Sequence, residues 1–137
     1  MKRLVVLGGG ESGVGAALLG KEKGFDVFVS DFGTLKKVYK DVLKHNAIEW
    51  EEGKHTASKI LNADVVMKSP GISEQVPIVK ALLETGISVV SEIEFAAQFT
   101  SADIIGITGS NGKTTTTMMT NHILNQAKFD VVMGGNI

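Results

Sequence analysis

The sequence contains no cysteine, which excludes disulfides, thiol catalysis and cysteine-ligated zinc. It also lacks an excess of either charge: 14 basic and 15 acidic residues leave a net charge of −1, which argues against nucleic acid as a partner. No apolar run approaches the roughly 20 residues that a membrane-spanning helix requires, and the run after the basic pair near the N-terminus is interrupted at Gly8. We therefore expect a soluble, cytoplasmic protein with no membrane insertion.

The composition favours a packed core. Apolar residues make up 43% of the chain and charged residues 21%, which is typical of folded domains. A chain of 137 residues has room for one domain, or for a small domain and a piece of another. We expect a boundary within 91–100, and we assign a first domain to 1–92 and an incomplete second domain to 93–137.

Segments with the apolar patterns of strands and helices alternate along the chain. Strands are predicted at 3–8, 25–31, 47–53, 63–68, 87–92, 103–108 and 129–135. Helices are predicted at 13–23, 34–44, 77–84, 92–99 and 113–127, with Thr34 capping the second and Pro77 in the first turn of the third. This alternation predicts an α/β fold, with a mostly parallel sheet and helices on both faces.

A glycine loop with a lysine lies between the last two predicted strands, in "TGSNGKTT" at 108–115. Gly109 and Gly112 permit positive φ angles and let backbone N–H groups converge on phosphate oxygens, and the following helix adds partial positive charge at its N-terminus. Lys113 is placed to reach the β- and γ-phosphates, and the Thr114 hydroxyl to ligate Mg²⁺. The pattern predicts an ATP-binding loop.

The loop departs from the general P-loop pattern G-x-x-x-x-G-K-[ST], which would require a glycine where Ile107 stands. The alternative is a strand–turn–helix corner with a surface lysine. We favour the phosphate loop because lysine and threonine follow the last glycine directly, between a strand and a helix. The residues assigned to ATP are Gly109, Ser110, Asn111, Gly112, Lys113, Thr114 and Thr115.

An earlier glycine loop, "GGGESGVG" at 8–15, contains G-x-G-x-x-G after a strand and before a helix. Asp31 ends the next predicted strand, which completes the layout of a dinucleotide fingerprint. Taken alone, this layout predicts NAD with Asp31 on the ribose, and the alternative is a tight turn that binds nothing. Glu11 would repel a pyrophosphate unless its carboxylate points toward sugar or base.

The two loops together resemble those of the Mur ligases, whose ATP loop has the form T-G-[ST]-N-G-K-[ST]-[ST]. "GITGSNGKTT" has this form, and the Ile107 departure is normal for the family. "SPGI" at 69–72, "SEIEF" at 91–95 and "GGNI" at 134–137 resemble the members that add D-glutamate to UDP-N-acetylmuramoyl-L-alanine. The resemblance covers the whole chain in order. It implies a Rossmann-like UDP-sugar-binding domain followed by the first β-α-β of a central P-loop ATP-binding domain.

The resemblance also implies which residues contact the UDP-sugar. They are Gly10, Glu11, Ser12 and Gly13 at the diphosphate, Asp31, Phe32 and Gly33 around uracil, Ser69, Pro70 and Gly71 on the diphosphate side, and Asn136 toward the muramoyl group. Some members carry polar or basic residues after the aspartate, and the Phe32-Gly33 pair departs from that pattern.

The implied activity is an ATP-dependent ligation in peptidoglycan synthesis, through an acyl-phosphate intermediate. ATP and Mg²⁺ are the implied cofactors, Lys113 the implied catalytic residue, and D-glutamate the second substrate; the full-length enzyme is expected to be a monomer. Further residues of the family lie beyond Ile137, so this chain alone is expected to be inactive. Other classes stay open: a nicotinamide-dependent oxidoreductase domain, a non-catalytic nucleotide-binding module, or a related muramoyl-peptide or folate ligase.

The remaining polar residues carry weaker signals. His45, His55 and His122 show no metal-ligand spacing, and we expect surface or structural roles for them. Glu92 and Glu94 lie two apart and would face different sides of a helix, so solvated or capping roles are expected rather than acid–base work.

Overall fold

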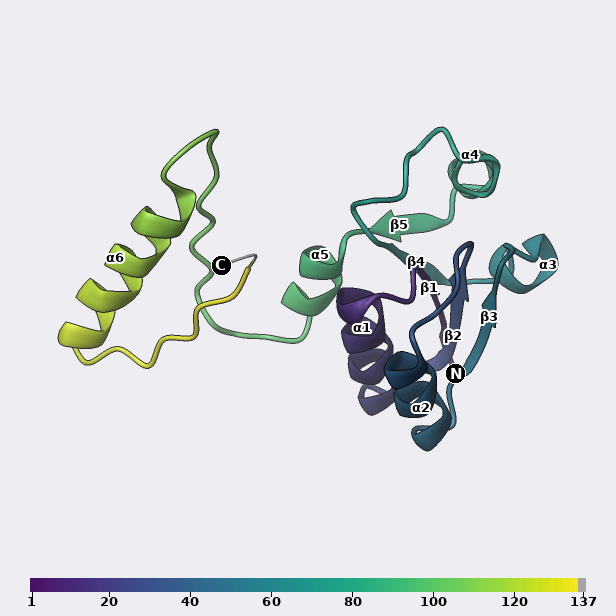
Figure 1. The fold of residues 1–137 in the computed structure, drawn as a ribbon, viewed down its shortest axis with the longest axis horizontal. Helices are drawn as coiled ribbons and strands as arrows, with labels where there is room; N and C mark the ends of the chain where they lie inside the picture. Colours follow the sequence, from purple (N-terminus) through teal and green to yellow (C-terminus); the bar gives the residue numbers. More distant parts are fainter. Residues whose placement is uncertain (136–137) are drawn as a thin grey trace. The chain divides into compact units, whose positions relative to one another are not determined.

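The computed structural model describes residues 1–135, and Figure 1 shows its elements. The chain divides into one unit over Met1–Thr100 and a second that begins at Ser101. The first unit contains a five-stranded sheet in the order β3-β2-β1-β4-β5, in which every neighbouring pair is parallel. Its strands are Arg3–Leu7 (β1), Asp26–Asp31 (β2), Glu49–Glu52 (β3), Val65–Lys68 (β4) and Ser88–Val90 (β5).

Helices cover both faces of this sheet. Along β1, Leu4 and Val6 join a buried cluster with α1, α2 and α5, whereas Val5 and Leu7 join a second cluster with α3 and α4. All four side chains are fully buried. The predicted α/β fold is therefore confirmed, although the sequence pattern did not predict α3. The helices are Glu11–Glu22 (α1), Lys37–His45 (α2), Ala57–Ile60 (α3), Pro77–Glu84 (α4) and Glu92–Ala97 (α5).

Helix α2 begins later than the sequence pattern indicated. Its N-cap is Lys36, without a side-chain cap, so the prediction that Thr34 caps this helix is wrong. Leu35 is the reason: its side chain is buried, and its amide donates to Glu52 Oε2 at 2.8 Å. This contact holds the segment before α2 against the end of β3 and prevents a helical turn there.

Helix α5 belongs to the first unit. Ser91 and Glu94 form a capping box, in which each side chain accepts the backbone amide of the other, so the capping role expected of Glu94 is confirmed. Phe95 is 1% exposed and packs edge-to-face on Phe99 with ring centroids 5.2 Å apart. Because of this aromatic packing, the first unit ends at Thr100, which is later than the assigned end at 92 and at the limit of the range 91–100 expected for the boundary.

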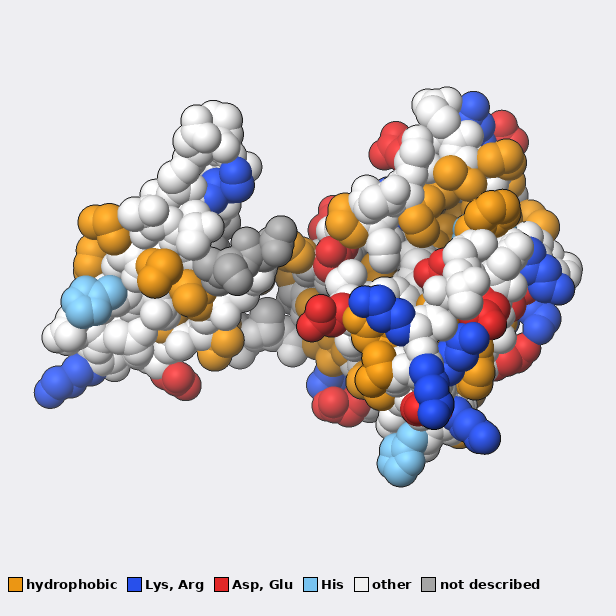
Figure 2. Space-filling model, in the orientation of Figure 1, with side chains coloured by type: hydrophobic (Ala, Val, Ile, Leu, Met, Phe, Trp, Pro, Cys, Tyr) orange, Lys and Arg blue, Asp and Glu red, His pale blue; other side chains and the backbone are white. Residues whose placement is uncertain are grey.

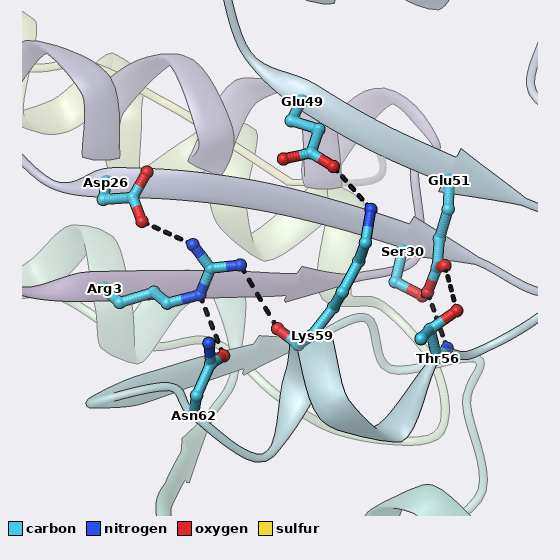
Figure 3. A network of polar contacts seen from close by, with 8 residues as sticks. All are labelled: Arg3, Asp26, Ser30, Glu49, Glu51, Thr56, Lys59 and Asn62. Atoms are coloured by element: carbon cyan, nitrogen blue, oxygen red, sulfur yellow. Dashed lines mark hydrogen bonds and ion pairs between the residues drawn. The ribbon is translucent and has the colours of Figure 1, made fainter.

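A polar network ties the strands together where β1, β2 and β3 begin (Figure 3). The Arg3 guanidinium pairs with the Asp26 carboxylate, donates to Asn62 Oδ1 at 3.0 Å and donates to the Lys59 carbonyl at 3.3 Å. Lys59 Nζ in turn pairs with Glu49 at 2.5 Å. These charged groups thus pair with one another at the edge of the sheet where the strands begin.

The second unit contains helix α6 (Lys113–Gln126) as predicted. The strands predicted at 103–108 and 129–135 are wrong, because neither forms among the described residues. A strand needs a neighbour for its backbone groups, and the apolar side chains here lack one as well: Ile104 and Ile105 are 62% and 61% exposed, and α6 buries no residue. Within residues 1–135, no helix has the length and apolar character to cross a membrane.

Candidate functional site: the carboxyl edge and the lysine loop

The three segments predicted to contact the UDP-sugar follow strands that are neighbours in the sheet (Figure 1). Residues 10–13 follow β1, residues 31–33 lie at the end of β2, and residues 69–71 follow β4. The chain order reverses between β1 and β4, which is the point where open α/β sheets bind ligands. The structure therefore brings these segments to one carboxyl edge.

Close packing explains two of the glycines after β1. A Cβ on Gly13 would lie 1.8 Å from the Gly8 carbonyl oxygen, and a Cβ on Gly8 would lie 2.6 Å from Ser69 Oγ. Gly8 also has a φ of +96°, which L side chains rarely adopt. Around Gly10, by contrast, no atom lies within 4 Å of a built Cβ. The loop is thus compressed against the sheet at Gly8 and Gly13 and open at Gly10.

The N-terminus of α1 presents, next to this opening, backbone amides that the helix itself does not pair. Gly10 is the N-cap and supplies no side-chain cap, and the first backbone bond of the helix runs from Val14 N to the Gly10 carbonyl. The amides of Glu11, Ser12 and Gly13 precede that bond and have no acceptor within the helix. Such amides, with the positive end of the helix dipole, favour an anion.

Asp31 joins the loop after β1 to the loop after β2. Its Oδ2 accepts the Gly9 amide at 2.6 Å, and its Oδ1 accepts the Gly33 amide at 2.7 Å. Both carboxylate oxygens thus accept backbone amides, and Asp31 fixes the shape of the edge. An aspartate that binds a ribose would instead direct its carboxylate oxygens toward the ribose hydroxyl groups. Phe32 lies between Asp31 and Gly33, and its side chain is 72% exposed.

The segment after β4 is anchored from both sides. The Ser69 amide donates to the Leu7 carbonyl at 3.0 Å, and Lys68 Nζ donates to the Ile72 carbonyl at 2.7 Å. Pro70 and Gly71 remain exposed. A hollow of about 400 Å³ lies between this segment, α4 and β5, lined by Lys68, Pro70, Glu74, Val79, Leu83, Val89, Val90, Ser91 and Glu94.

A buried polar network at the same edge was missed by the sequence reasoning. Ser30 Oγ lies 2.7 Å from Glu51 Oε1, and the Thr56 amide and hydroxyl donate to the two Glu51 oxygens at 2.7 and 2.6 Å (Figure 3). Ser30 Oγ also lies 2.7 Å from His55 Nδ1. Glu51 is only 8% exposed. An acidic residue inside a short strand pattern was the sole sequence signal, and it is equally typical of a solvated strand face.

The surroundings of Glu51 keep it ionised. Burial raises the pKa of its carboxyl, but the amide and hydroxyl of Thr56, the hydroxyl of Ser30 and the nearby charge of Lys54 outweigh that effect, and the net pKa is lowered. The carboxylate therefore acts as an acceptor that fixes the ends of β2 and β3 relative to each other.

The two glycines of the loop before α6 adopt positive φ angles, as the sequence predicted. Gly109 and Gly112 have φ angles of +152° and +77°, and Gly112 is the N-cap of α6. The first backbone bond of this helix runs from Thr116 N to the Gly112 carbonyl, so the amides of residues 113–115 have no acceptor within the helix. Lys113 Nζ lies across the loop and donates to the Gly109 carbonyl at 2.6 Å.

The remaining residues assigned to ATP and Mg²⁺ are also accessible. Ser110, Asn111, Thr114 and Thr115 are all exposed. No group of three metal-ligating side chains occurs among residues 1–135. The Thr114 hydroxyl lies in the first turn of α6, where it could add an oxygen to a Mg²⁺ ion held at the phosphates. Asn136, predicted near the muramoyl group, lies outside the described residues.

Comparisons with known proteins agree with this geometry. The model of the MurD N-terminal domain family matches residues 3–78. A UDP-N-acetylmuramoylalanine–D-glutamate ligase of Christiangramia forsetii is 60% identical over 136 residues, which are 99% of this chain and 31% of that protein. One of Bacteroides fragilis is 56% identical over 100% of this chain and 31% of its own length.

A solved structure is similar over nearly the whole chain. The UDP-N-acetylmuramate:L-alanyl-gamma-D-glutamyl-meso-diaminopimelate ligase (MPL) from Neisseria meningitides has a TM-score of 0.67 and 25% identity, over 98% of this chain and 43% of its own. An open parallel sheet with a glycine loop at the carboxyl end of its central strand places the first unit in the class of Rossmann-like α/β domains. Within that class, the match to the family model shows that the chain belongs to the MurD family. The chain spans 31% of the length of the curated relatives named above.

Proposed function

We propose that this chain supplies the UDP-sugar site and the first part of the ATP site of a ligase that joins D-glutamate to UDP-N-acetylmuramoyl-L-alanine in peptidoglycan synthesis. The observation that supports this most is the convergence of 10–13, 31–33 and 69–71 on one sheet edge, in a chain 60% identical to a ligase of that name. From the sequence, we assigned a UDP-sugar domain to 1–92 and the start of the ATP domain to 93–137. Because α5 packs in the first unit, we propose that the UDP-sugar domain extends to Thr100, in a monomeric cytoplasmic enzyme.

Each edge segment has a proposed role in holding the sugar nucleotide. The amides of Glu11, Ser12 and Gly13 bind the diphosphate, and the missing side chain of Gly10 lets the ligand approach the backbone. Asp31 holds Phe32 and Gly33 in position for the uridine. Residues 69–71 close the other side of the diphosphate, and Asn136 contacts the muramoyl group.

The loop over 109–115 is proposed to bind ATP. Its amides and Lys113 surround the β- and γ-phosphates, and Mg²⁺, when bound beside Thr114, neutralises phosphate charge. Lys113 Nζ contacts the Gly109 and Ser110 carbonyl oxygens, and a phosphate oxygen bound in the loop would replace these neutral acceptors with a charged one. At 4 Å, two unit charges interact by about 4 kcal/mol at an effective dielectric of 20, so this ammonium is a large contribution to bringing two anions together.

The proposed chemistry has two steps. A carboxylate oxygen of the muramoyl-L-alanine attacks the γ-phosphorus of ATP, the bond to the bridging oxygen breaks, and ADP leaves. The amine of D-glutamate then attacks the acyl carbon, loses a proton, and expels inorganic phosphate to leave the amide. The contribution of this chain is to position both substrates and to balance charge with Lys113.

Calorimetric titration of the chain with UDP-N-acetylmuramoyl-L-alanine, UDP and NADH tests the proposal. Binding of both uridine ligands without turnover is expected, because the chain spans 31% of its relatives' length. A nicotinamide-binding domain is the second candidate, since G-x-G-x-x-G occupies residues 8–13. Preference for NADH with no response to uridine ligands would establish that alternative and overturn the ligase proposal.

A further inference from the structure

Two rings stand together at the carboxyl edge, next to the loop that Asp31 holds. Phe32 directly follows β2 and is 72% exposed, whereas His55 follows β3 and is half-buried. Their ring centroids lie 5.8 Å apart, and the ring planes are inclined by 43°. The pair therefore presents an apolar ring face and a polar ring side by side in the region proposed for the uridine.

Hydrogen bonding fixes the tautomer of His55. The ionised Glu51 carboxylate can only accept, so the single hydroxyl proton of Ser30 points to Glu51 Oε1 at 2.7 Å and not to the more distant Lys54 carbonyl at 3.4 Å. The Ser30 oxygen then offers only a lone pair to His55 Nδ1, which also lies 2.7 Å away. Nδ1 must therefore carry the proton in this contact.

The other ring nitrogen is consequently an acceptor. Burial lowers the pKa of His55, against the charges of Glu51 and Asp31, which raise it, and the net pKa is below the ordinary value, so the ring is neutral at neutral pH. With Nδ1 protonated, Nε2 carries a lone pair, and no group within residues 1–135 donates a hydrogen bond to it. An N–H donor is the ligand group that this nitrogen fits.

We propose that His55 Nε2 accepts the N3–H of the uracil base while the Phe32 ring packs on the face of that base, so that this pair selects uridine over cytidine nucleotides. The inference rests on the proposed function, because it assigns the base of the same UDP-sugar. Uracil carries a proton on N3, whereas cytosine carries a lone pair there, which would face the lone pair of Nε2. The Glu51–Ser30–His55 relay acts as a positioning device that holds the ring in the selective tautomer.

The sharpest test compares UDP and CDP binding to the chain and to His55→Asn. The Asn amide nitrogen can take the place of Nδ1 and keep the bond to Ser30, but Asn has no atom in the place of Nε2. UDP affinity should fall about tenfold, because one hydrogen bond to the base is lost, whereas CDP affinity should stay the same or rise, because a lone pair that opposes cytosine N3 is removed. An unchanged ratio of UDP to CDP affinity would overturn the inference. If that unchanged ratio came with an equal loss of both affinities, the nitrogen would contact the shared ribose phosphate part of the ligands.

Two further variants complete the test. Phe32→Leu should weaken UDP and CDP alike by about tenfold, since base–ring packing does not depend on N3, and the exposed site makes a folding defect easy to exclude by thermal unfolding. His45→Asn, at the end of α2, is the matched control and should change neither affinity. If the unaltered chain binds neither UDP nor CDP, the proposed function fails; if it binds both but His55→Asn does not alter the ratio, only the base assignment fails.

Discussion

The carboxylate of Asp31 accepts the amides of Gly9 and Gly33, and so ties the loop after β1 to the loop after β2. Neither amide has another acceptor in the described part of the chain. Asp31 is therefore a structural requirement for the shape of the edge, in addition to any contact that it makes with a ligand.

Asp31→Asn should lower the free energy of unfolding by about 1–3 kcal/mol, because an amide –NH₂ group would face one of the two backbone donors. Urea unfolding followed by circular dichroism measures this change. Asp41→Asn, at an exposed position of α2, is the control and should be neutral. Equal stability of the two variants would show that the two loops keep their positions without the carboxylate.

Two glycines of α1 predict opposite outcomes for the same substitution. A Cβ at Gly13 would lie 1.8 Å from a backbone oxygen, so Gly13→Ala should destabilise the fold by about 3 kcal/mol or more. Gly15 has nothing within 4 Å, so Gly15→Ala should stabilise it by about 0.5–1 kcal/mol through helix propensity. Thermal unfolding of the two variants decides the matter, and a stable Gly13→Ala protein would contradict the tight contact between α1 and the loop.

The Glu51–His55 network predicts that the free energy of unfolding decreases as pH is lowered, in two separate pH ranges. The pKa of His55 is lowered in the folded state, so the unfolded chain binds the proton first as pH falls through the ordinary value of 6.5, and stability decreases from there. The pKa of Glu51 is also lowered, so its stabilisation is present above the ordinary value of 4.5 and is lost as pH falls through the lower folded value.

Urea unfolding at a series of pH values checks both windows. His55→Asn should flatten the upper window, near pH 6.5, and leave the lower one in place. Glu51→Gln should flatten the lower window and also reduce stability at pH 7 by about 1–3 kcal/mol, because the Gln amide cannot accept from both Thr56 donors and Ser30. Parallel pH profiles for all three proteins would exclude a role of this network in the pH dependence.

Much of the first unit could be predicted because local pattern and tertiary fold agree there. The apolar run at residues 4–7 is a central strand buried on both faces, and Pro77 begins α4 as its fixed φ favours. The edge segments were found because glycines and an aspartate follow predicted strands, and the resemblance to a known family supplied their expected ligand.

The features that the sequence predicted wrongly or missed share a physical cause: they depend on contacts between distant parts of the chain. Thr34 does not cap α2 because Leu35 is held by Glu52, which is remote in sequence. The pattern at 103–108 is apolar enough for a strand, but a strand exists only with a partner that shares its backbone bonds. The Ser30–Glu51–His55 contact likewise depends on pairing of β2 with β3, which no single segment reveals.

Lys113 should matter for ATP and not for folding. Its ammonium is exposed and contacts only loop carbonyls, so Lys113→Met should leave the unfolding temperature unchanged while weakening MgATP binding at least tenfold. Lys128→Met, beyond the end of α6, is the control for loss of one positive charge in the same unit. Fluorescent ATP-analogue titration measures the affinities, and equal binding by the two variants would remove Lys113 from the phosphate site.

The two units should differ in resistance to trypsin. The first unit buries apolar side chains on both faces of its sheet, whereas α6 buries none, and Ile104, Met119 and Ile123 are at least 60% exposed. Local opening requires little loss of apolar burial in the second unit, so cleavage at Lys113 and Lys128 should precede cleavage at Lys80 of α4, which is also exposed. Mass spectrometry of a timed digest should show a lasting product that contains residues 1–100 and keeps the thermal transition of the intact chain. Simultaneous cleavage at Lys80 and Lys113 would show instead that the two units open together, and that the stability of the sheet depends on residues after 100.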